Sequence, residues 1–269
     1  MEVETISKGS HIGGPPKGTE RVMENAELVG LSRQVTLKRQ LSVVANNLAN
    51  MNTSGFKAES SLFEEHLRSA ASHNGFERRD RPISFVHDDR TLTDLSTGAI
   101  VRTDNPTDMA LADDQFFTIQ MEGGEPLYTR NGAFVIDNQG TLTTTEGRPV
   151  AGAGGGPIVF EQGDTNVSVA RDGTVSTDQG VRGQLAIVTI TNEDGLTRRE
   201  DNLFASDDAA PAQSPGVSQG FIEKSNVKAV LEVARMIEIT RAYERIAKQI
   251  QRQDEIRRDA IRKLGKLEA

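Results

Sequence analysis

Two long amphipathic segments, one near each end of the chain, most constrain what this sequence can fold into. Residues 23–67 repeat apolar side chains at helical spacing, and the helical period returns in residues 220–269. Between them, residues 100–208 carry short alternating runs separated by turn signals, which is typical of antiparallel strands. We therefore expect an α+β fold in which N- and C-terminal helices form a coiled-coil-like assembly domain and the middle forms an antiparallel all-β domain.

Three further segments connect or precede these parts. Residues 1–22 are rich in Gly, Pro, Ser and Lys without an apolar period, and we expect a disordered leader there. Residues 68–99 are charged and irregular, which predicts a linker with short strands. Residues 209–219 include two prolines and are expected to be a second linker before the C-terminal assembly helix.

Each helical segment carries apolar residues on more than one face. The N-terminal segment has one stripe at Leu28, Leu31 and Val35 and a second at Leu37, Leu41, Val44 and Leu48. The C-terminal segment has one stripe at Val227, Val230, Ala234 and Ile237 and a second at Ile239, Tyr243, Ile246 and Ile250. Pairing the two helices within one chain would bury only one stripe on each. We therefore expect self-association to bury the rest.

Asparagines cluster where the first helical segment ends. Asn46, Asn47, Asn50 and Asn52 are poor helix formers, so they indicate either a frayed, capped helix end or polar groups that fix the register of packed helices. Gly55 is expected to end or kink this helix in the left-handed conformation. The expected assembly interface comprises Leu37, Leu41, Val44, Asn46, Asn47, Leu48, Asn50, Asn52, Phe56, Ser225, Asn226, Val227, Val230, Ile237, Tyr243, Ile246 and Ile250.

Composition excludes several kinds of chemistry. The chain has no cysteine, which rules out disulfides, thiolate nucleophiles and Cys-ligated metals, and its four histidines lack the spacing of metal ligands. No catalytic motif is present, so we expect no enzyme activity, no cofactor and no metal. The chain also lacks a signal peptide and any long apolar run, which predicts neither a cleaved signal nor membrane insertion.

Charge is distributed unevenly along the chain. Its net charge is -8, but residues 104–208 contain 18 acidic and 6 basic side chains, a net charge of -12. Residues 244–269 contain 8 basic and 5 acidic side chains, a net charge of +3. An acidic middle repels phosphate backbones, so we expect no nucleic-acid partner.

Three separated motifs resemble those of the flagellar axial proteins, the family of rod and hook subunits. The first is residues 45–50 (ANNLAN) with residues 53–57 (TSGFK), and the second is residues 107–117 (TDMALADDQFF) with residues 128–134 (YTRNGAF). The third is residues 220–227 (GFIEKSNV), followed by residues 241–244 (RAYE). The sequence departs from the family pattern at residues 113–115, where a glycine-containing turn is usual.

The resemblance implies a non-enzymatic subunit of the proximal rod in the flagellar basal body. Such a protein leaves the cytoplasm through the flagellar type III export apparatus, assembles helically with copies of itself and with other rod proteins in the periplasm, and transmits motor torque. A distal rod or hook-type subunit is the alternative within the family. From another class, a secreted carbohydrate-active or adhesive β domain on helical stalks remains an alternative.

Overall fold

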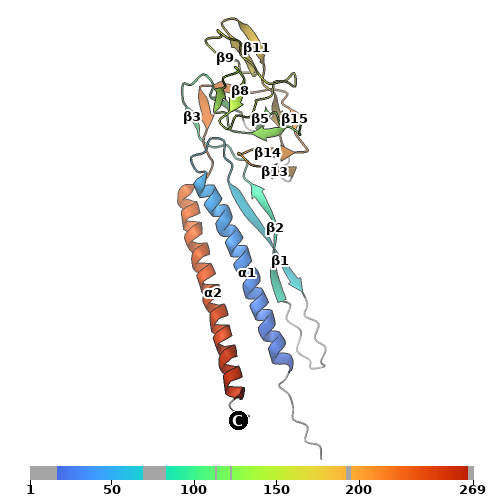
Figure 1. Cartoon of the computed structure of the whole chain (residues 1–269), viewed down its shortest axis with the longest axis vertical. Helices are drawn as coiled ribbons and strands as arrows, with labels where there is room; N and C mark the ends of the chain where they lie inside the picture. The colour runs from blue at the N-terminus through green and yellow to red at the C-terminus, as the bar shows by residue number, and fades with distance from the viewer. Residues whose placement is uncertain (1–16, 69–82, 113, 122, 192–194, 266–269) are drawn as a thin grey trace, which may run out of the picture. The chain divides into compact units, whose positions relative to one another are not determined.

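The computed structural model describes residues 17–68, 83–112, 114–121, 123–191 and 195–265, and the side chains of these residues except 17–28, 63–68, 83–90, 264 and 265. It is an α+β structure, as predicted, with two long helices and many short strands (Figure 1). The elements, in chain order, are α1 Lys17–Ala49, β1 Glu59–Arg68, β2 Ile83–Thr93, β3 Ile100–Arg102, β4 Met109–Leu111, β5 Gln115–Ile119, β6 Leu127–Thr129, β7 Phe134–Ile136, β8 Leu142–Thr144, β9 Ser168–Val169, β10 Thr174–Thr177, β11 Gly180–Gln184, β12 Ile187–Thr189, β13 Leu196–Arg198, β14 Phe204–Ser206, β15 Ala210–Pro211, β16 Val217–Gln219, β17 Phe221–Glu223 and α2 Ala229–Gly265.

The chain divides into two compact units. The helical unit comprises Met1–Leu37, Glu64–His87 and Ala242–Ala269, and the β unit comprises Lys38–Phe63 and Asp88–Arg241. Within the helical unit, α1 and α2 pack against each other at Gly30, where an added methyl group would lie 3.2 Å from Ile250 Cγ1. The β unit also contains the end of α1 and the start of α2, next to the strands.

Small antiparallel sheets build the β unit. The largest has six strands in the order β13-β14-β6-β5-β12-β15, and a three-stranded sheet has the order β11-β10-β9. Two-stranded sheets join β16 to β4, β17 to β3 and β7 to β8. The pairings β16-β4 and β17-β3 connect the segment before α2 to the start of the middle region, and therefore hold residues more than 100 positions apart in sequence.

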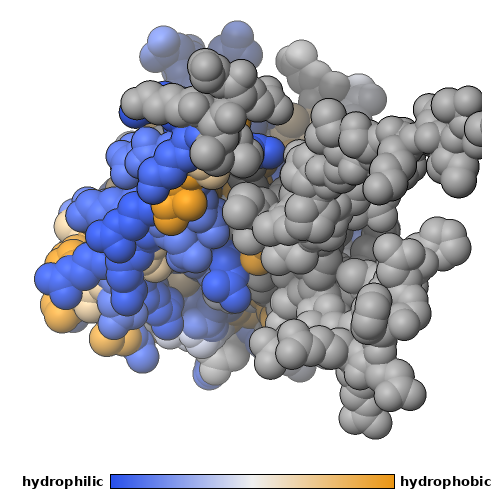
Figure 2. Space-filling model, turned by 90° about the horizontal axis from the view of Figure 1, so that it is seen from below, coloured by the Kyte–Doolittle hydropathy of each residue, from blue (hydrophilic) through white to orange (hydrophobic). Residues whose placement is uncertain are grey.

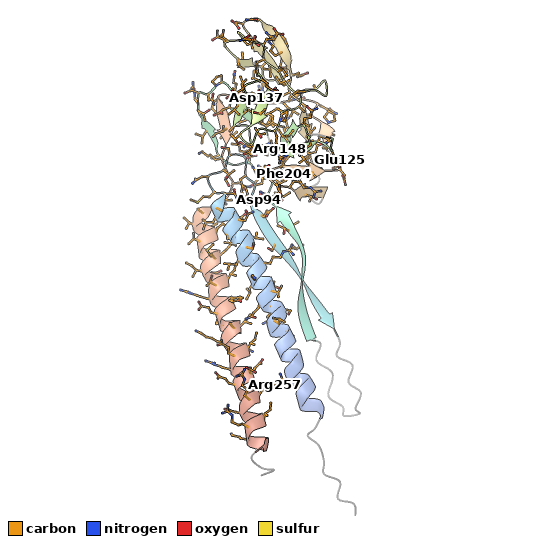
Figure 3. The ribbon with its side chains drawn as sticks, viewed as in Figure 1. Asp94, Glu125, Asp137, Arg148, Phe204 and Arg257 are labelled. Carbon is orange, nitrogen blue, oxygen red and sulfur yellow. The ribbon has the colours of Figure 1, made fainter. Side chains whose placement is uncertain are left out.

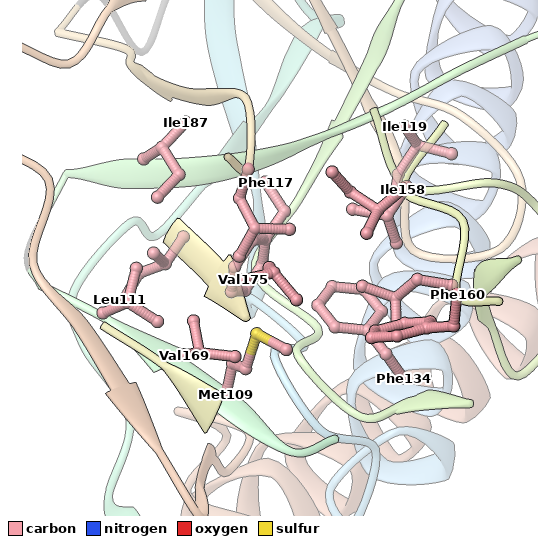
Figure 4. Packing of buried hydrophobic residues seen from close by; sticks show 14 of the residues in the cluster. Met109, Leu111, Phe117, Ile119, Phe134, Ile158, Phe160, Val169, Val175 and Ile187 are labelled. Carbon is pink, nitrogen blue, oxygen red and sulfur yellow. The ribbon is translucent and has the colours of Figure 1, made fainter. Parts of the chain in front are cut away.

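A single main apolar core fills the space between these sheets. Phe117 of β5 and Phe134 of β7 meet edge to face with ring centroids 4.9 Å apart, an arrangement that aromatic rings favour. Met109, Phe160 and Val175 pack around them (Figure 4). Because these side chains come from five different segments, the core holds the short strands in place better than strand pairing alone would.

The β unit contains two hairpins whose turns each include an aspartate. β7 pairs with β8 across a turn in which Asp137 Oδ1 accepts the amides of Gln139 and Thr141, both at 2.8 Å. β9 pairs with β10 across a turn in which Asp172 Oδ1 accepts the Thr174 amide at 2.9 Å. Aspartate thus closes both turns through its side chain, as its turn preference predicts.

The N-terminal helix has different ends from those predicted. It already includes residues 17–22, which were expected to be disordered, while residues 1–16 lie outside the described residues. It stops at Ala49, and residues 59–67, expected to be helical, belong to strand β1 instead. Pairing of β1 with β2 overrides the local helical preference of this stretch. Gly55 has the expected left-handed φ of 65° but lies beyond the helix end.

The segment before the C-terminal helix also differs from the prediction. Residues 220–228 were expected to be helical, but Phe221–Glu223 forms β17 and α2 starts only at Ala229. Residues 209–219, expected to be a linker, contain β15 and β16. β16 and β17 each form a sheet with a strand much earlier in the chain, a partner that local sequence patterns do not specify.

The departure from the family pattern at residues 113–115 coincides with an uncommon backbone conformation. Asp114 has a φ of 60°, in the left-handed region that glycine adopts without strain. Its carbonyl oxygen accepts the Ile190 amide at 3.2 Å. The turn therefore keeps the geometry of a glycine turn although an aspartate occupies it.

Gly132 gives a test of the core. A Cβ atom there would lie 1.7 Å from the Met109 carbonyl oxygen, so Gly132→Ala must displace β4, and we expect the free energy of unfolding to fall by about 3 kcal/mol or more. Chemical denaturation measures this loss. The matched variant is Gly154→Ala, because a methyl group at Gly154 meets no atom within 4 Å. An equal, small effect of both substitutions would contradict the packing described here.

Candidate assembly site

A buried carboxylate joins three distant segments of the β unit. Glu223 is 1% exposed, and its Oε1 accepts Lys57 Nζ at 2.8 Å and the Gly98 amide at 3.0 Å. Its Oε2 accepts Arg130 Nε at 2.8 Å. Lys57 follows α1, Arg130 follows β6, and Glu223 lies shortly before α2. One carboxylate therefore holds together the segments next to both helices. We call Lys57, Arg130 and Glu223 the Glu223 cluster.

Main-chain carbonyl groups complete the Glu223 cluster. Lys57 Nζ donates to two carbonyl oxygens at 2.8 and 3.0 Å, and Arg130 Nη1 donates to two more. Burial lowers the pKa of Lys57, and its hydrogen bond to Glu223 opposes this shift. Two cations share one carboxylate, so the carbonyl dipoles supply the remaining negative potential.

Gly55 allows the chain to pass close to this cluster. Its amide donates to the Glu223 carbonyl oxygen at 2.8 Å, and a Cβ atom would lie 2.3 Å from the Asn131 amide nitrogen. Together with the positive φ, this close approach leaves no room for a larger residue. The role of Gly55 is therefore to bring the segment after α1 against the segment after β6.

A second, half-buried guanidinium packs on Phe56. Arg198 Cζ lies 4.3 Å from the centroid of the Phe56 ring and 5.1 Å from that of Phe204, which Figure 3 labels. Arg198 Nε lies 2.6 Å from Glu59 Oε1. Burial lowers the pKa of Arg198, and Glu59 opposes the shift. Phe56 is thus buried inside the single chain.

Asn47 pairs with the first strand through its side chain. Asn47 Nδ2 donates to the Glu59 carbonyl oxygen at 2.8 Å, and Asn47 Oδ1 accepts the Glu59 amide at 2.9 Å. Asn47 Nδ2 also lies 3.5 Å from Glu232 Oε2 on α2. This amide therefore acts as a neighbouring strand would, and it links α1, β1 and α2 within one chain.

Asn226 makes the corresponding connection before α2. Its Oδ1 accepts the Ala58 amide at 2.7 Å, and its Nδ2 donates to the carbonyl oxygens of Asp94, labelled in Figure 3, at 2.8 Å and of Ser96 at 3.0 Å. Both asparagines thus join the segments that lead into and out of the helices.

The other asparagines lie at the end of α1. Asn50 Nδ2 donates to the Asn46 carbonyl oxygen at 2.9 Å, and Thr53 Oγ1 donates to Asn50 Oδ1 at 3.1 Å. Asn46 and Asn52 are exposed. These contacts fit the helix-end interpretation of Asn46 and Asn50.

The helices leave apolar side chains in solvent. On α2, Val230 is 83% and Ile237 47% exposed, and Val233 between them is also exposed. Spacings of three and four residues place them on one face, which we call the outer stripe. Tyr243 is exposed as well, and on α1 so are Leu31 and Val35. In the view from below, Figure 2 shows a few apolar side chains among many hydrophilic ones.

The remaining residues of the predicted interface are less exposed than the outer stripe, because other parts of the same chain cover them. Val44 is buried. Those that are half-buried are Leu37, Leu41, Leu48, Ser225, Asn226, Val227, Ile246 and Ile250. Other residues of the same chain therefore cover much of one apolar stripe on each helix, whereas the outer stripe stays exposed.

The described residues contain few features of a catalytic or metal centre. No group of three or more His, Asp or Glu side chains among them could hold a metal ion. His11 and His73 lie outside the described residues, and the side chains of His66 and His87 are not described. The pKa values of Asp164, Asp172 and Asp178 are held below the usual range, chiefly by hydrogen bonds to the carboxylates. A general acid needs the opposite shift.

No described helix has an apolar stretch of the length and hydropathy that crossing a membrane would require.

Sequence reasoning missed the ionic contacts. Lys57, Arg130 and Glu223 each lie inside one of the three motifs, but nothing in their spacing indicates that they meet. The only signal was that each motif contains at least one charged side chain. No sequence pattern singled out Arg198, which lies outside the three motifs.

Three family profiles match successive parts of the chain. "Flagella basal body rod protein" matches residues 28–57, "Flagellar hook protein FlgE/F/G D1 domain" matches residues 110–177, and "Flagellar basal body rod FlgEFG protein C-terminal" matches residues 218–263. Lys57 and Glu223 fall in the first and last of these, and Arg130 falls in the middle one.

Curated relatives resemble the chain over most of its length. It is 37% identical over 249 residues to the flagellar basal-body rod protein FlgF of Caulobacter vibrioides, covering 91% of this chain and 100% of the relative. It is 33% identical to FlgF of Rhizobium meliloti, covering 83% and 91%. It is 32% identical to the flagellar basal-body rod protein FlgG of Bacillus subtilis, covering 86% and 96%.

The Glu223 cluster can be tested by removing its negative charge. Glu223→Gln leaves two buried cations without their carboxylate, so we expect the free energy of unfolding to fall by about 3–5 kcal/mol. Denaturant titration followed by circular dichroism measures the change. The control is Glu200→Gln, because Glu200 is exposed. A loss no greater than that of the control would show that the cluster does not hold these segments together.

Proposed function

Since the chain belongs to the flagellar basal-body rod protein family, we propose that it is a structural subunit of the proximal rod, which self-assembles helically and transmits motor torque. Its relatives are structural rod proteins, in agreement with the expected non-enzymatic role. The proximal position is supported by the FlgF relatives. A distal rod subunit is the alternative within the family, because FlgG relatives match over a similar length.

The outer stripe is the observation that carries this proposal. Val230, Val233 and Ile237 are apolar and exposed in the single chain. Burial of one such side chain contributes roughly 1.5–3 kcal/mol, so several copies of this contact stabilise a polymer. We propose that neighbouring subunits cover the outer stripe with their own helices in a coiled-coil-like arrangement.

The partners and location follow from this role. We propose that the chain assembles with copies of itself and with other rod proteins in the periplasm. We further propose that the flagellar type III apparatus exports it without cleavage of a signal peptide. Stiffness of the rod would then arise from many repeated helix contacts, because a single interface of this kind is weak.

Substitutions in the outer stripe test the role in assembly. We expect the double substitution Val230→Glu with Ile237→Glu to leave the chain folded, since both side chains are exposed, and to abolish rod assembly, since charge is introduced into a contact that excludes water. Complementation of swimming in cells that lack the native protein measures assembly.

The matched control is Val181→Glu, because Val181 of β11 is 69% exposed and lies outside both helices. This variant should restore swimming. Normal swimming with the stripe variant would contradict the proposed role of the outer stripe.

Truncation of α2 separates folding from assembly. Removing residues 249–269 deletes no residue of the β unit, so the shortened chain should keep the near-ultraviolet circular dichroism and cooperative unfolding of that unit. It should nevertheless fail to enter the rod, because α2 loses its last turns, about five in number. Incorporation of the shortened chain into isolated basal bodies would count against the proposal.

A further inference from the structure

A groove of about 300 Å³ lies in the β unit where the end of α1, the start of β1 and the start of α2 meet. Val43 and Val44 of α1 and Ile239 of α2 provide apolar walls. Glu232 and Glu238 of α2 and Ser61 of β1 add oxygen atoms. Its volume is suited to one or two side chains rather than to a domain or a long peptide.

The groove has more hydrogen-bond acceptors than donors. Glu232 is buried. The side chain that pairs with it is Arg235, whose Nη1 lies 2.7 Å from Glu232 Oε1 and which is itself 58% exposed. Ser61 Oγ is buried and has no hydrogen-bond partner. Among the described contacts none pairs the exposed carboxylate of Glu238 with a cation. A carboxylate can accept about four hydrogen bonds, so these groups retain acceptor capacity.

A long basic side chain has the chemistry to fill this space. The methylene groups of an arginine can lie along the valine and isoleucine walls, and its guanidinium carries five donors for the carboxylates and the serine. An acidic side chain would add a further negative charge beside Glu232 and Glu238, and an aliphatic one would leave Ser61 Oγ without a partner. The groove therefore favours arginine or lysine as its occupant.

The last part of α2 offers such side chains. Arg252, Arg258 and Arg262 are exposed on it, within the segment of net charge +3. They cannot reach the groove of their own chain, because α2 is one continuous helix and Arg252 lies about 21 Å along the axis from Glu238 at 1.5 Å per residue. The donor must belong to a second copy.

We infer that the groove receives an arginine from the C-terminal half of α2 of a neighbouring subunit. This inference rests on the proposed function and adds the direction of assembly. Groove and donor lie at opposite ends of the same helix, so the contact joins two different surfaces. A contact of this kind repeats without closing and produces an open filament. The charge pair fixes the axial register of adjacent copies, and the outer stripe supplies apolar area.

A charge reversal in the full-length chain tests the groove. Glu238→Arg places a cation where the inference needs an acceptor, and we expect self-association, measured by sedimentation over a range of concentrations, to weaken at least about tenfold. The matched control is Glu146→Arg, because Glu146 is an exposed residue of the β unit and the change in net charge is the same. This control should associate as the unaltered chain does.

A charge swap identifies the occupant. A second variant with Arg252→Glu, Arg258→Glu and Arg262→Glu should also fail to associate, while circular dichroism shows its helices intact. A mixture of the two variants in equal amounts should associate again, because each groove then meets a tail of opposite charge.

The possible outcomes separate this inference from the proposed function. Undiminished association of the Glu238→Arg chain overturns the inference and leaves the proposed function standing, as does a mixture of the two variants that stays monomeric. An unaltered chain that stays monomeric at every concentration and is absent from isolated basal bodies overturns the proposed function, and the inference with it.

Discussion

The structure depends on one buried carboxylate with two cations. Glu223 holds Lys57 from the segment after α1 and Arg130 from the middle of the β unit, and all three side chains are almost fully removed from water. Isolated buried charges are strongly unfavourable, so the three segments are stable only together. This requirement fixes where α1 ends and where the chain leaves the sheets toward α2. Asn47 and Asn226 strengthen the same connection with neutral hydrogen bonds.

This connection determines which apolar faces of the helices pack within the chain and which stay exposed to solvent. Because Asn47 ties the end of α1 to both β1 and the start of α2, the helix faces around Val44 and Ile239 turn toward the chain itself. The face with Val230, Val233 and Ile237 is left in solvent. An exposed apolar stripe on a long helix is unusual for a protein that acts alone. We propose that the next copy of the chain binds on this face.

Sequence patterns predicted those parts of the fold that depend on nearby residues. The helical repeats located most of both helices, and the alternating runs with turn signals located the antiparallel strands of the middle region. The pattern failed at residues 59–67, which pair with the next strand β2, and at residues 221–223, which pair with the distant strand β3. The Glu223 cluster joins positions 57, 130 and 223, and no periodicity relates them. Such contacts become visible only once the chain is folded.

The most direct test measures whether neighbouring copies cover the outer stripe. The chain has no cysteine, so Ile237→Cys and Val181→Cys each introduce one reactive thiol. In dilute solution a maleimide reagent should label both thiols rapidly, since both positions are exposed. In isolated basal bodies the thiol at position 237 should be protected while that at position 181 still reacts. Equally rapid labelling of the thiol at position 237 in basal bodies and in solution would contradict the account.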